Sequence, residues 1–158
     1  DSGALLKLNK SKIEISGYFG DLFEKLRHDF SDNNLKTCLP PQKTFGTFDP
    51  GKIERAVRNI VSNAVKFSPK HSEISLRTSI EESEIIFTCE DQGIGVGKDD
   101  LKHLFEPYFR VDATDSATEG SGLGLAIVKQ IVNAHNGQIQ FESQTGKGST
   151  VTFYIPLT

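Results

Sequence analysis

The sequence has no methionine, no tryptophan and only two cysteines, Cys38 and Cys89, among its 158 residues. The cysteines form no CxxC pair and have no histidine nearby at metal-binding spacing, so we expect no zinc site. Reduced thiols in a cytosolic setting are the simplest interpretation. No apolar run approaches the roughly 18 residues of a membrane-spanning helix, and no signal peptide opens the chain. We therefore expect no direct membrane contact by this segment.

An excess of basic charge is also absent. The chain has 18 Lys and Arg against 21 Asp and Glu, a formal net charge of -3, so we expect no nucleic-acid partner. Its length, with 36% hydrophobic residues and no tandem repeat, fits one globular domain. We assign residues 13–158 to that domain. Residues 1–12 are interpreted as a linker or an expression remnant, because the opening Asp1-Ser2-Gly3 and the missing methionine suggest a piece of a longer protein.

Apolar residues at three- and four-residue spacing predict three main helices. These are Ile13 to Phe30, a segment that Asp49-Pro50 opens and that ends before Ser68-Pro69, and about Gly122 to His135. The third helix is predicted to bury one face, formed by Leu123, Ile127, Ile131 and Ala134.

Short runs of alternating or dense apolar residues predict strands. They are Leu35–Leu39, Thr44–Phe48, a hairpin of Glu73–Ile80 and Glu84–Glu90, and the closing strands Gln138–Ser143 and Ser149–Ile155. A short helix is expected near Lys98–Phe105. The predicted fold is a two-layer α/β (α+β) sandwich, with three main helices over one face of a mixed sheet.

Two glycine-rich runs stand out, Glu90-Asp91-Gln92-Gly93-Ile94-Gly95 and Gly120-Ser121-Gly122-Leu123-Gly124-Leu125. Glycine lets a backbone approach a nucleotide closely, and a helix that opens at Gly122 directs unpaired N–H groups at an anion. Taken alone, the first run also fits a simple turn after a strand.

The second predicted helix carries polar residues beside its apolar stripe. Asn59, Asn63 and Lys66 share one face, at positions i, i+4 and i+7. Asparagine oxygens can ligate magnesium, and a lysine can supply positive charge for phosphates. For this helix alone, a solvated surface is the alternative interpretation.

An aromatic cluster, Phe105-Glu106-Pro107-Tyr108-Phe109-Arg110, lies between the two glycine runs. The order of asparagine helix, acidic glycine loop, aromatic cluster and second glycine loop resembles the N, G1, F and G2 boxes of the catalytic, ATP-binding domain of sensor histidine kinases. The resemblance covers roughly residues 45 to 157. It implies the Bergerat ATP-binding fold with a five-stranded sheet, ATP or ADP with magnesium as ligands, and a flexible lid near residues 96–121.

The resemblance also implies roles for single residues. Asp91 would accept a hydrogen bond from the exocyclic amine of adenine, which guanine cannot offer there. Asn59 and Asn63 would hold magnesium, and Lys66 and Arg110 would contact the phosphates. The catalytic candidates are Asn59, Lys66 and Arg110. The other residues expected at the nucleotide are Gly93 and Gly95 near the base, and Gly120, Ser121, Gly122, Leu123 and Gly124 around the phosphates.

The same fold also serves ATPases, so the fold alone does not define the reaction. In those relatives a glutamate four residues before the magnesium-binding asparagine acts as the general base for water. Here Asn59 occupies that position, and a carboxamide cannot take a proton from water. A kinase has less need of a base, because an acceptor imidazole is already basic at neutral pH. The resemblance thus implies transfer of the γ-phosphate of ATP to a histidine of a separate dimerisation domain, and then to a response regulator.

The acceptor histidine is not expected in this chain. His28 lies on the first predicted helix without the proline of the family's acceptor pattern, so we interpret it as a surface residue. We expect the isolated chain to be a monomer and a cytoplasmic domain of a protein whose membrane helices can lie upstream. The alternative function is a non-catalytic, nucleotide-sensing module of the same fold.

Overall fold

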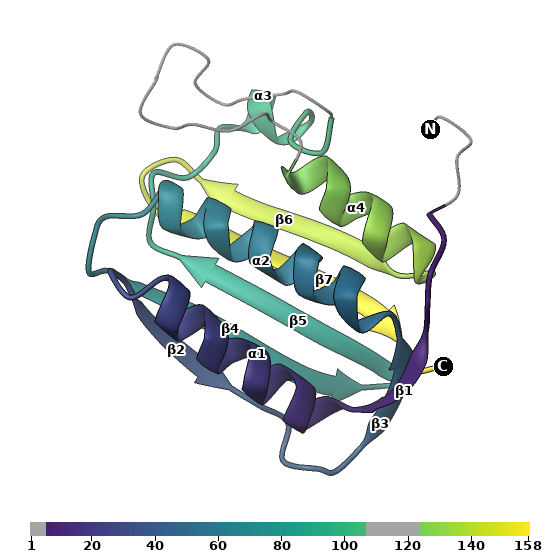
Figure 1. Cartoon of the computed structure of the whole chain (residues 1–158). Coiled ribbons are helices and arrows are strands. Elements are labelled where there is room, and N and C mark those ends of the chain that lie inside the picture. Colours follow the sequence, from purple (N-terminus) through teal and green to yellow (C-terminus); the bar gives the residue numbers. More distant parts are fainter. Residues whose placement is uncertain (1–5, 107–123) are drawn as a thin grey trace.

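The computed structural model describes residues 6–106 and 124–158. Its main element is a five-stranded sheet with the strand order β2-β4-β5-β7-β6, so β2 and β6 form its edges. The helices α1, α2 and α4 cover one face of this sheet (Figure 1). This arrangement confirms the predicted two-layer sandwich, with three main helices over one face of a mixed five-stranded sheet.

The strands are β1 (Ser11–Glu14), β2 (Asn34–Cys38), β3 (Phe45–Phe48), β4 (Glu73–Glu81), β5 (Glu84–Asp91), β6 (Gln138–Gln144) and β7 (Gly148–Pro156). The helices are α1 (Ile15–Asp29), α2 (Pro50–Lys66), α3 (Lys98–Leu101) and α4 (Gly124–Ala134). Helix α3 ends earlier than the expected Phe105. Within residues 6–106 and 124–158, none of the helices combines the length and the apolar character that crossing a bilayer requires.

The sheet is mixed because β2 runs parallel to β4, whereas the other neighbouring strands are antiparallel. Asp91, the last residue of β5, lies opposite Ser149 of β7. Ser149 in turn lies opposite Ser143 of β6. These three residues therefore form a row across three neighbouring strands at one end of the sheet.

Helix α2 begins where the sequence predicts, because local signals define its start. The carboxylate of Asp49 accepts a hydrogen bond from the Lys52 N–H at 3.0 Å, and Pro50 occupies the first turn. The helix ends at Lys66, before Ser68-Pro69. The start of this helix is thus defined by a few adjacent residues.

Strand β1 pairs antiparallel with β3 in a small second sheet that the sequence analysis did not predict. The predicted first helix began at Ile13, but α1 begins at Ile15 because Glu14 acts as its N-cap. The Glu14 carboxylate accepts hydrogen bonds from the N–H groups of Ser16 and Gly17, both at 3.0 Å. Strand β1 also includes the end of the segment that was assigned to a linker.

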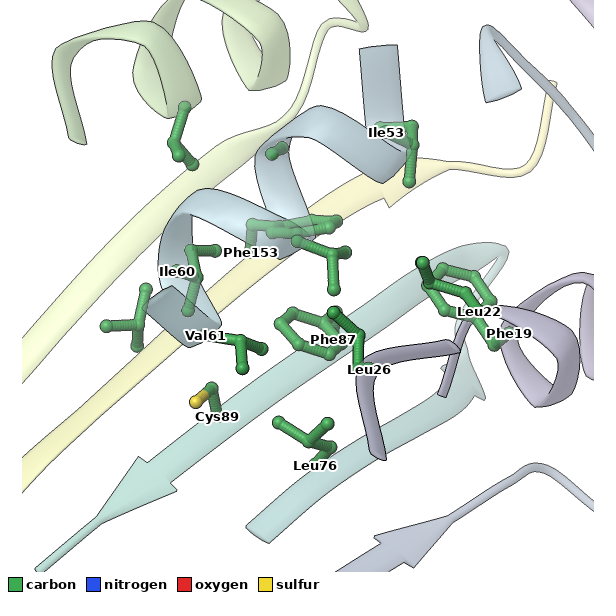
Figure 2. Close-up of a cluster of buried hydrophobic side chains, with 14 of the residues drawn as sticks. Phe19, Leu22, Leu26, Ile53, Ile60, Val61, Leu76, Phe87, Cys89 and Phe153 are labelled. Carbon is green, nitrogen blue, oxygen red and sulfur yellow. The ribbon is translucent and has the colours of Figure 1, made fainter. Parts of the chain in front are cut away.

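The core lies between the sheet and the helices and is rich in phenylalanine. Figure 2 shows side chains from α1, α2 and the central strands meeting there, among them Phe19, Leu26, Ile60 and Phe87. The rings of Phe87 and Phe153 on neighbouring strands lie 5.2 Å apart between centroids. Full burial of one such side chain contributes about 1.5–3 kcal/mol, so this layer fixes α1 and α2 on the sheet.

Helix α4 buries a broader surface than the sequence analysis expected. Its buried residues are Leu125, Ala126, Val128, Ile131 and Val132. Of the predicted face, Ile131 is buried, whereas Ile127 and Ala134 are half-buried and Leu123 lies outside the described residues. The predicted face was therefore only partly correct, because α4 packs against α2 as well as against β6 and β7.

Candidate functional site

A buried carboxylate lies at the end of β5. The side chain of Asp91 accepts a hydrogen bond from the N–H of Gly93 at 2.8 Å, and Ser149 lies directly opposite it on β7. Burial raises the pKa of Asp91 above its usual range, and the nearby charge of Glu90 acts in the same direction. The backbone N–H groups of Gly93 and Ser149 act on the pKa in the opposite direction because they favour the charged form. Asp91 is therefore a fixed hydrogen-bond acceptor with little exposure to water.

The loop after Asp91 needs its glycines for close approach to the rest of the backbone. A Cβ on Gly93 would lie 2.3 Å from the carbonyl oxygen of Phe67. Gly95 has a positive φ of 74°, and a Cβ there would lie 2.1 Å from the carbonyl oxygen of Gln144. Sequence analysis expected these glycines to lie near a nucleotide base. The structure shows a second reason for glycine at these two positions. Larger residues would separate the loop from the end of α2 and from the β6–β7 turn.

The same loop is held by hydrogen bonds on both sides. The N–H of Ile94 donates to Phe67 O at 3.2 Å, at the end of α2. On the other side, the N–H of Gly146 donates to Ile94 O at 2.7 Å, and the N–H of Val96 donates to Ser143 Oγ at 2.6 Å. Three separate parts of the chain thus fix the path between β5 and α3.

The side chain of Ile94 is 58% exposed although its backbone is anchored on both sides. An exposed isoleucine in a well-held loop beside a buried carboxylate can offer an apolar surface to a planar ring. In the sequence, Ile94 stands out only as part of the glycine run. Its exposure follows from the backbone path of the loop, which a local sequence pattern does not define.

The polar stripe of α2 faces the beginning of α4. The Asn59 carboxamide donates a long hydrogen bond of 3.5 Å to Gly124 O. A Cβ on Gly124 would lie 4.0 Å from the carboxamide atoms of Asn63. Lys66, the last residue of α2, is exposed. The structure therefore brings Asn59, Asn63 and Gly124 together, and their roles at phosphate and magnesium stay predictions.

Several predicted site residues lie outside the described residues. These are Arg110 of the aromatic cluster and Gly120, Ser121, Gly122 and Leu123 of the second glycine run. The expected lid near residues 96–121 falls there for most of its length. The proposed roles of these residues stay predictions.

A buried histidine supports the site from the far end of α4, and the sequence analysis did not identify it. His135 Nε2 accepts a hydrogen bond from the N–H of Asp49 at 3.1 Å, while its Nδ1 lies 2.8 Å from Ile131 O, so that Nδ1 carries the proton. Burial lowers the pKa of His135 below its usual range. The neutral ring thus joins the end of α4 to the beginning of α2.

Asp49 completes this connection. Besides capping α2, its carboxylate accepts a hydrogen bond from the N–H of Asn9 at 2.8 Å. Burial would raise the pKa of Asp49, but the N–H groups of Asn9 and Lys52 outweigh it, and the pKa lies below its ordinary value. The segment before β1, the start of α2 and the end of α4 are therefore bound together, and this sets how α2 faces α4.

Several known proteins are similar to this chain. A family model described as "Histidine kinase-, DNA gyrase B-, and HSP90-like ATPase" matches residues 48–158. The chain is 46% identical over 134 residues to the sensor-like histidine kinase SenX3 of Mycolicibacterium smegmatis. This match covers 84% of this chain and 34% of that protein. The chain is 40% identical over 121 residues to the sensor histidine kinase WalK of Bacillus subtilis. This match covers 75% of this chain and 20% of that protein.

The chain therefore spans about a third or less of the length of these curated relatives. A similar solved structure is that of full-length ShkA in complex with AMPPNP, with a TM-score of 0.82 and 26% identity. The match covers 98% of this chain and 32% of that chain.

Proposed function

The chain belongs to the family of histidine kinase-, DNA gyrase B- and HSP90-like ATPases as an ATP-binding catalytic domain of the sensor histidine kinase type, and on this premise we propose how its residues take part in phosphotransfer. In the proposed reaction, this domain presents ATP to a histidine on a separate dimerisation domain. The imidazole nitrogen forms a bond to the γ-phosphorus while the bond from that phosphorus to the β–γ bridging oxygen breaks. ADP leaves, and the phosphoryl group stays on the histidine.

The buried carboxylate of Asp91 is the observation that supports nucleotide binding most directly. The N–H of Gly93 holds one of its oxygens, which leaves acceptor capacity for a further donor. We propose that the exocyclic amine of adenine is this donor. Guanine has a carbonyl oxygen at the corresponding position, so an acceptor at Asp91 selects adenine. The exposed side chain of Ile94 would contact a face of the base.

The phosphates are proposed to lie between α2 and the start of α4. Asn59 and Asn63 offer neutral oxygen ligands there, which suits magnesium beside phosphate oxygens. Magnesium, when bound, would neutralise part of the phosphate charge. Lys66 and Arg110 are proposed to supply further positive charge. The complex of ShkA with AMPPNP, an analogue of ATP, supports a nucleotide in this fold.

Phosphotransfer is proposed in preference to hydrolysis because of the chemistry of Asn59. A carboxamide has no basic site, so activation of water by this residue is not available. Positioning and charge compensation are then the contributions of this domain. We further propose a downstream response regulator and a cytoplasmic location for the domain, where ATP is available.

The test is phosphate transfer in trans. Radiolabelled ATP with magnesium is incubated with this chain alone and with the histidine-bearing dimerisation domain of its parent protein or of a relative such as SenX3. We expect no label on the chain alone and acid-labile label on the added domain. Arg110→Ala should reduce the transfer rate more than it reduces ATP binding, if Arg110 stabilises charge on the moving phosphoryl group.

Two outcomes would contradict the proposal. Acid-stable label on the chain alone would indicate a different kinase chemistry. ATP binding without label on any acceptor domain would favour a nucleotide-sensing module instead. Asp91→Asn serves as the matched control for nucleotide dependence, because it should lower the signal through ATP binding.

A further inference from the structure

We propose that Ser143 is a positioning residue for the loop of residues 92–97, and through this loop for the adenine contact of Asp91. The inference rests on the proposed function, because it concerns how the same site recognises its base. Ser143 lies on β6, on the side of the sheet that the helices cover, like the half-buried Ile139 and Phe141 before it. It has no proposed contact with nucleotide and acts on its neighbours.

The hydroxyl of Ser143 uses its full hydrogen-bonding capacity. It accepts from the N–H of Val96 at 2.6 Å and donates to Gly148 O at 3.0 Å. The hydroxyl of Ser149 lies 2.8 Å away. Because the single proton of Ser143 goes to Gly148 O, Ser149 is the donor in this pair. One hydroxyl thus joins the loop after β5 to the first residues of β7.

Val96 is a critical position for the loop because α3 begins two residues later, with Gly97 as its N-cap. Apart from the bond from Gly93 to the Asp91 carboxylate, the other anchors of this loop, through Ile94, join backbone atoms to backbone atoms. Substitution of a side chain leaves those bonds in place. The bond from Val96 to Ser143 is different, because it depends on a hydroxyl that a single substitution removes.

The hydroxyl of Ser143 is also connected to the surroundings of Asp91 through Ser149. Ser149 donates its side-chain proton to Ser143, and its Cα is the register partner of Asp91 on the neighbouring strand. The register of the strands places the three side chains in one row, with Asp91 opposite Ser149 and Ser149 opposite Ser143. Hydrogen bonds therefore run from the Val96 N–H through Ser143 to Ser149, the residue directly opposite the proposed adenine acceptor. Bonds in such a path reinforce one another in a half-buried setting.

The experiment compares Ser143→Ala with Ser143→Thr, which keeps the hydroxyl. Ser75→Ala is the control. Ser75 is on β4 at the same end of the sheet, where it lies opposite Glu90 of β5. Two quantities are measured on the whole chain: hydrogen exchange of the Val96 amide without nucleotide, and the affinities for ATP and GTP by calorimetry. Ser143→Ala should speed exchange at Val96 and weaken ATP binding by about fivefold, the typical effect of losing one hydrogen bond. It should also lower the ratio of ATP to GTP affinity, because the acceptor at Asp91 is less well oriented.

Ser143→Thr and Ser75→Ala should resemble the wild type in both measurements. Ser149→Ala gives an independent check, because it leaves the acceptor for Val96 in place. It should keep slow exchange at Val96 while still lowering the ATP to GTP ratio. This variant also keeps the inference testable if Ser143→Ala fails to fold.

The inference is overturned if Val96 exchanges at the wild-type rate in Ser143→Ala, or if Ser143→Thr is as impaired as Ser143→Ala. It is also overturned if Ser143→Ala and Ser149→Ala leave the ATP to GTP ratio unchanged. The exchange measurement needs no nucleotide. A wild-type chain that fails to bind ATP would therefore refute the proposed function, while Val96 exchange would still decide the role of Ser143.

Discussion

Replacing Asp91 with asparagine removes the charge of the carboxylate while nearly keeping its shape, and we expect it to weaken ATP binding selectively. In the wild type, one carboxylate oxygen accepts a hydrogen bond from the N–H of Gly93, the backbone N–H of Ser149 favours the charged form, and the proposed adenine amine is a further donor. Asparagine has one oxygen. If that oxygen stays with Gly93, the new NH2 group faces the remaining donors, and no hydrogen bond can form there.

The expected magnitude follows from this loss. A hydrogen bond to a charged acceptor contributes more than one to a neutral acceptor, and an unmatched buried donor adds a further cost. Together these effects predict a loss of about 1–3 kcal/mol in ATP binding. This corresponds to an increase of about 5- to 140-fold in the dissociation constant. GTP binding should weaken much less, because the NH2 group of asparagine can donate to the carbonyl oxygen of guanine.

Calorimetric titrations with ATP and GTP in the presence of magnesium measure both effects. Glu90→Gln is the matched control, because it removes the same charge from the neighbouring residue of β5, whose side chain is exposed. It should leave ATP affinity close to that of the wild type. Circular dichroism of all three proteins shows whether the fold is retained.

The reasoning fails if the wild type binds GTP as tightly as ATP. It also fails if a folded Asp91→Asn variant binds ATP like the wild type, or if Glu90→Gln is equally impaired. The last result would indicate a general effect of charge near the site and would leave no special role for the acceptor at the end of β5.

Three further predictions test the site and its support. Asn63→Ala should weaken magnesium-dependent ATP binding at least about tenfold, with an unchanged circular dichroism spectrum. Asn133→Ala, on the exposed surface of α4, should not weaken ATP binding. Unaltered magnesium dependence in Asn63→Ala would contradict the ligand role. Gly93→Ala should lower the free energy of unfolding in urea by about 1–3 kcal/mol, because its Cβ would lie 2.3 Å from a backbone oxygen. Gly97→Ala is the control: the atom nearest to its Cβ would lie 3.8 Å away, so the free energy of unfolding should change little. Folding lowers the pKa of His135, so as the pH falls through about 6.5 the unfolded chain binds a proton before the folded chain does. The free energy of unfolding should therefore be highest above this pH. It should decline at lower pH until the lowered pKa of the folded chain is passed. His135→Gln should remove this part of the decline in urea titrations, and a decline that survives the substitution would refute the assignment.

The parts of the fold that the sequence predicted well depend on residues close together in the chain. Helix α2 was located by Asp49 and Pro50 at its start. The hairpin of β4 and β5 was located by its alternating apolar residues, and its turn at Glu82 and Ser83 has the positive φ angles of a tight connection. Strand β1 was missed because its identity depends on pairing with β3, which lies more than thirty residues further along.

The candidate site divides in the same way. Asp91, Asn59 and Asn63 were predicted as site residues because the order and spacing of their motifs resemble those of a known family. The role of His135 was missed because its partner, the N–H of Asp49, is 86 residues away in sequence. Ser143 was missed for a related reason, since a serine in an alternating strand has no local feature that reveals what its hydroxyl contacts.

The two edges of the sheet differ in how well they resist aggregation, and this follows from the strand order. An edge strand presents free backbone groups to which another molecule can add a strand. Strand β2 is short, carries Lys36 and leads into Pro40-Pro41, which interrupts further pairing. Strand β6 is longer and reads Gln-Ile-Gln-Phe-Glu-Ser-Gln, with Glu142 as its one charged side chain. Uncharged segments of this length and β-propensity are typical of cross-β assembly, so Glu142 acts as a gatekeeper. The colloidal stability of concentrated protein therefore depends on a surface carboxylate that nucleotide binding does not require.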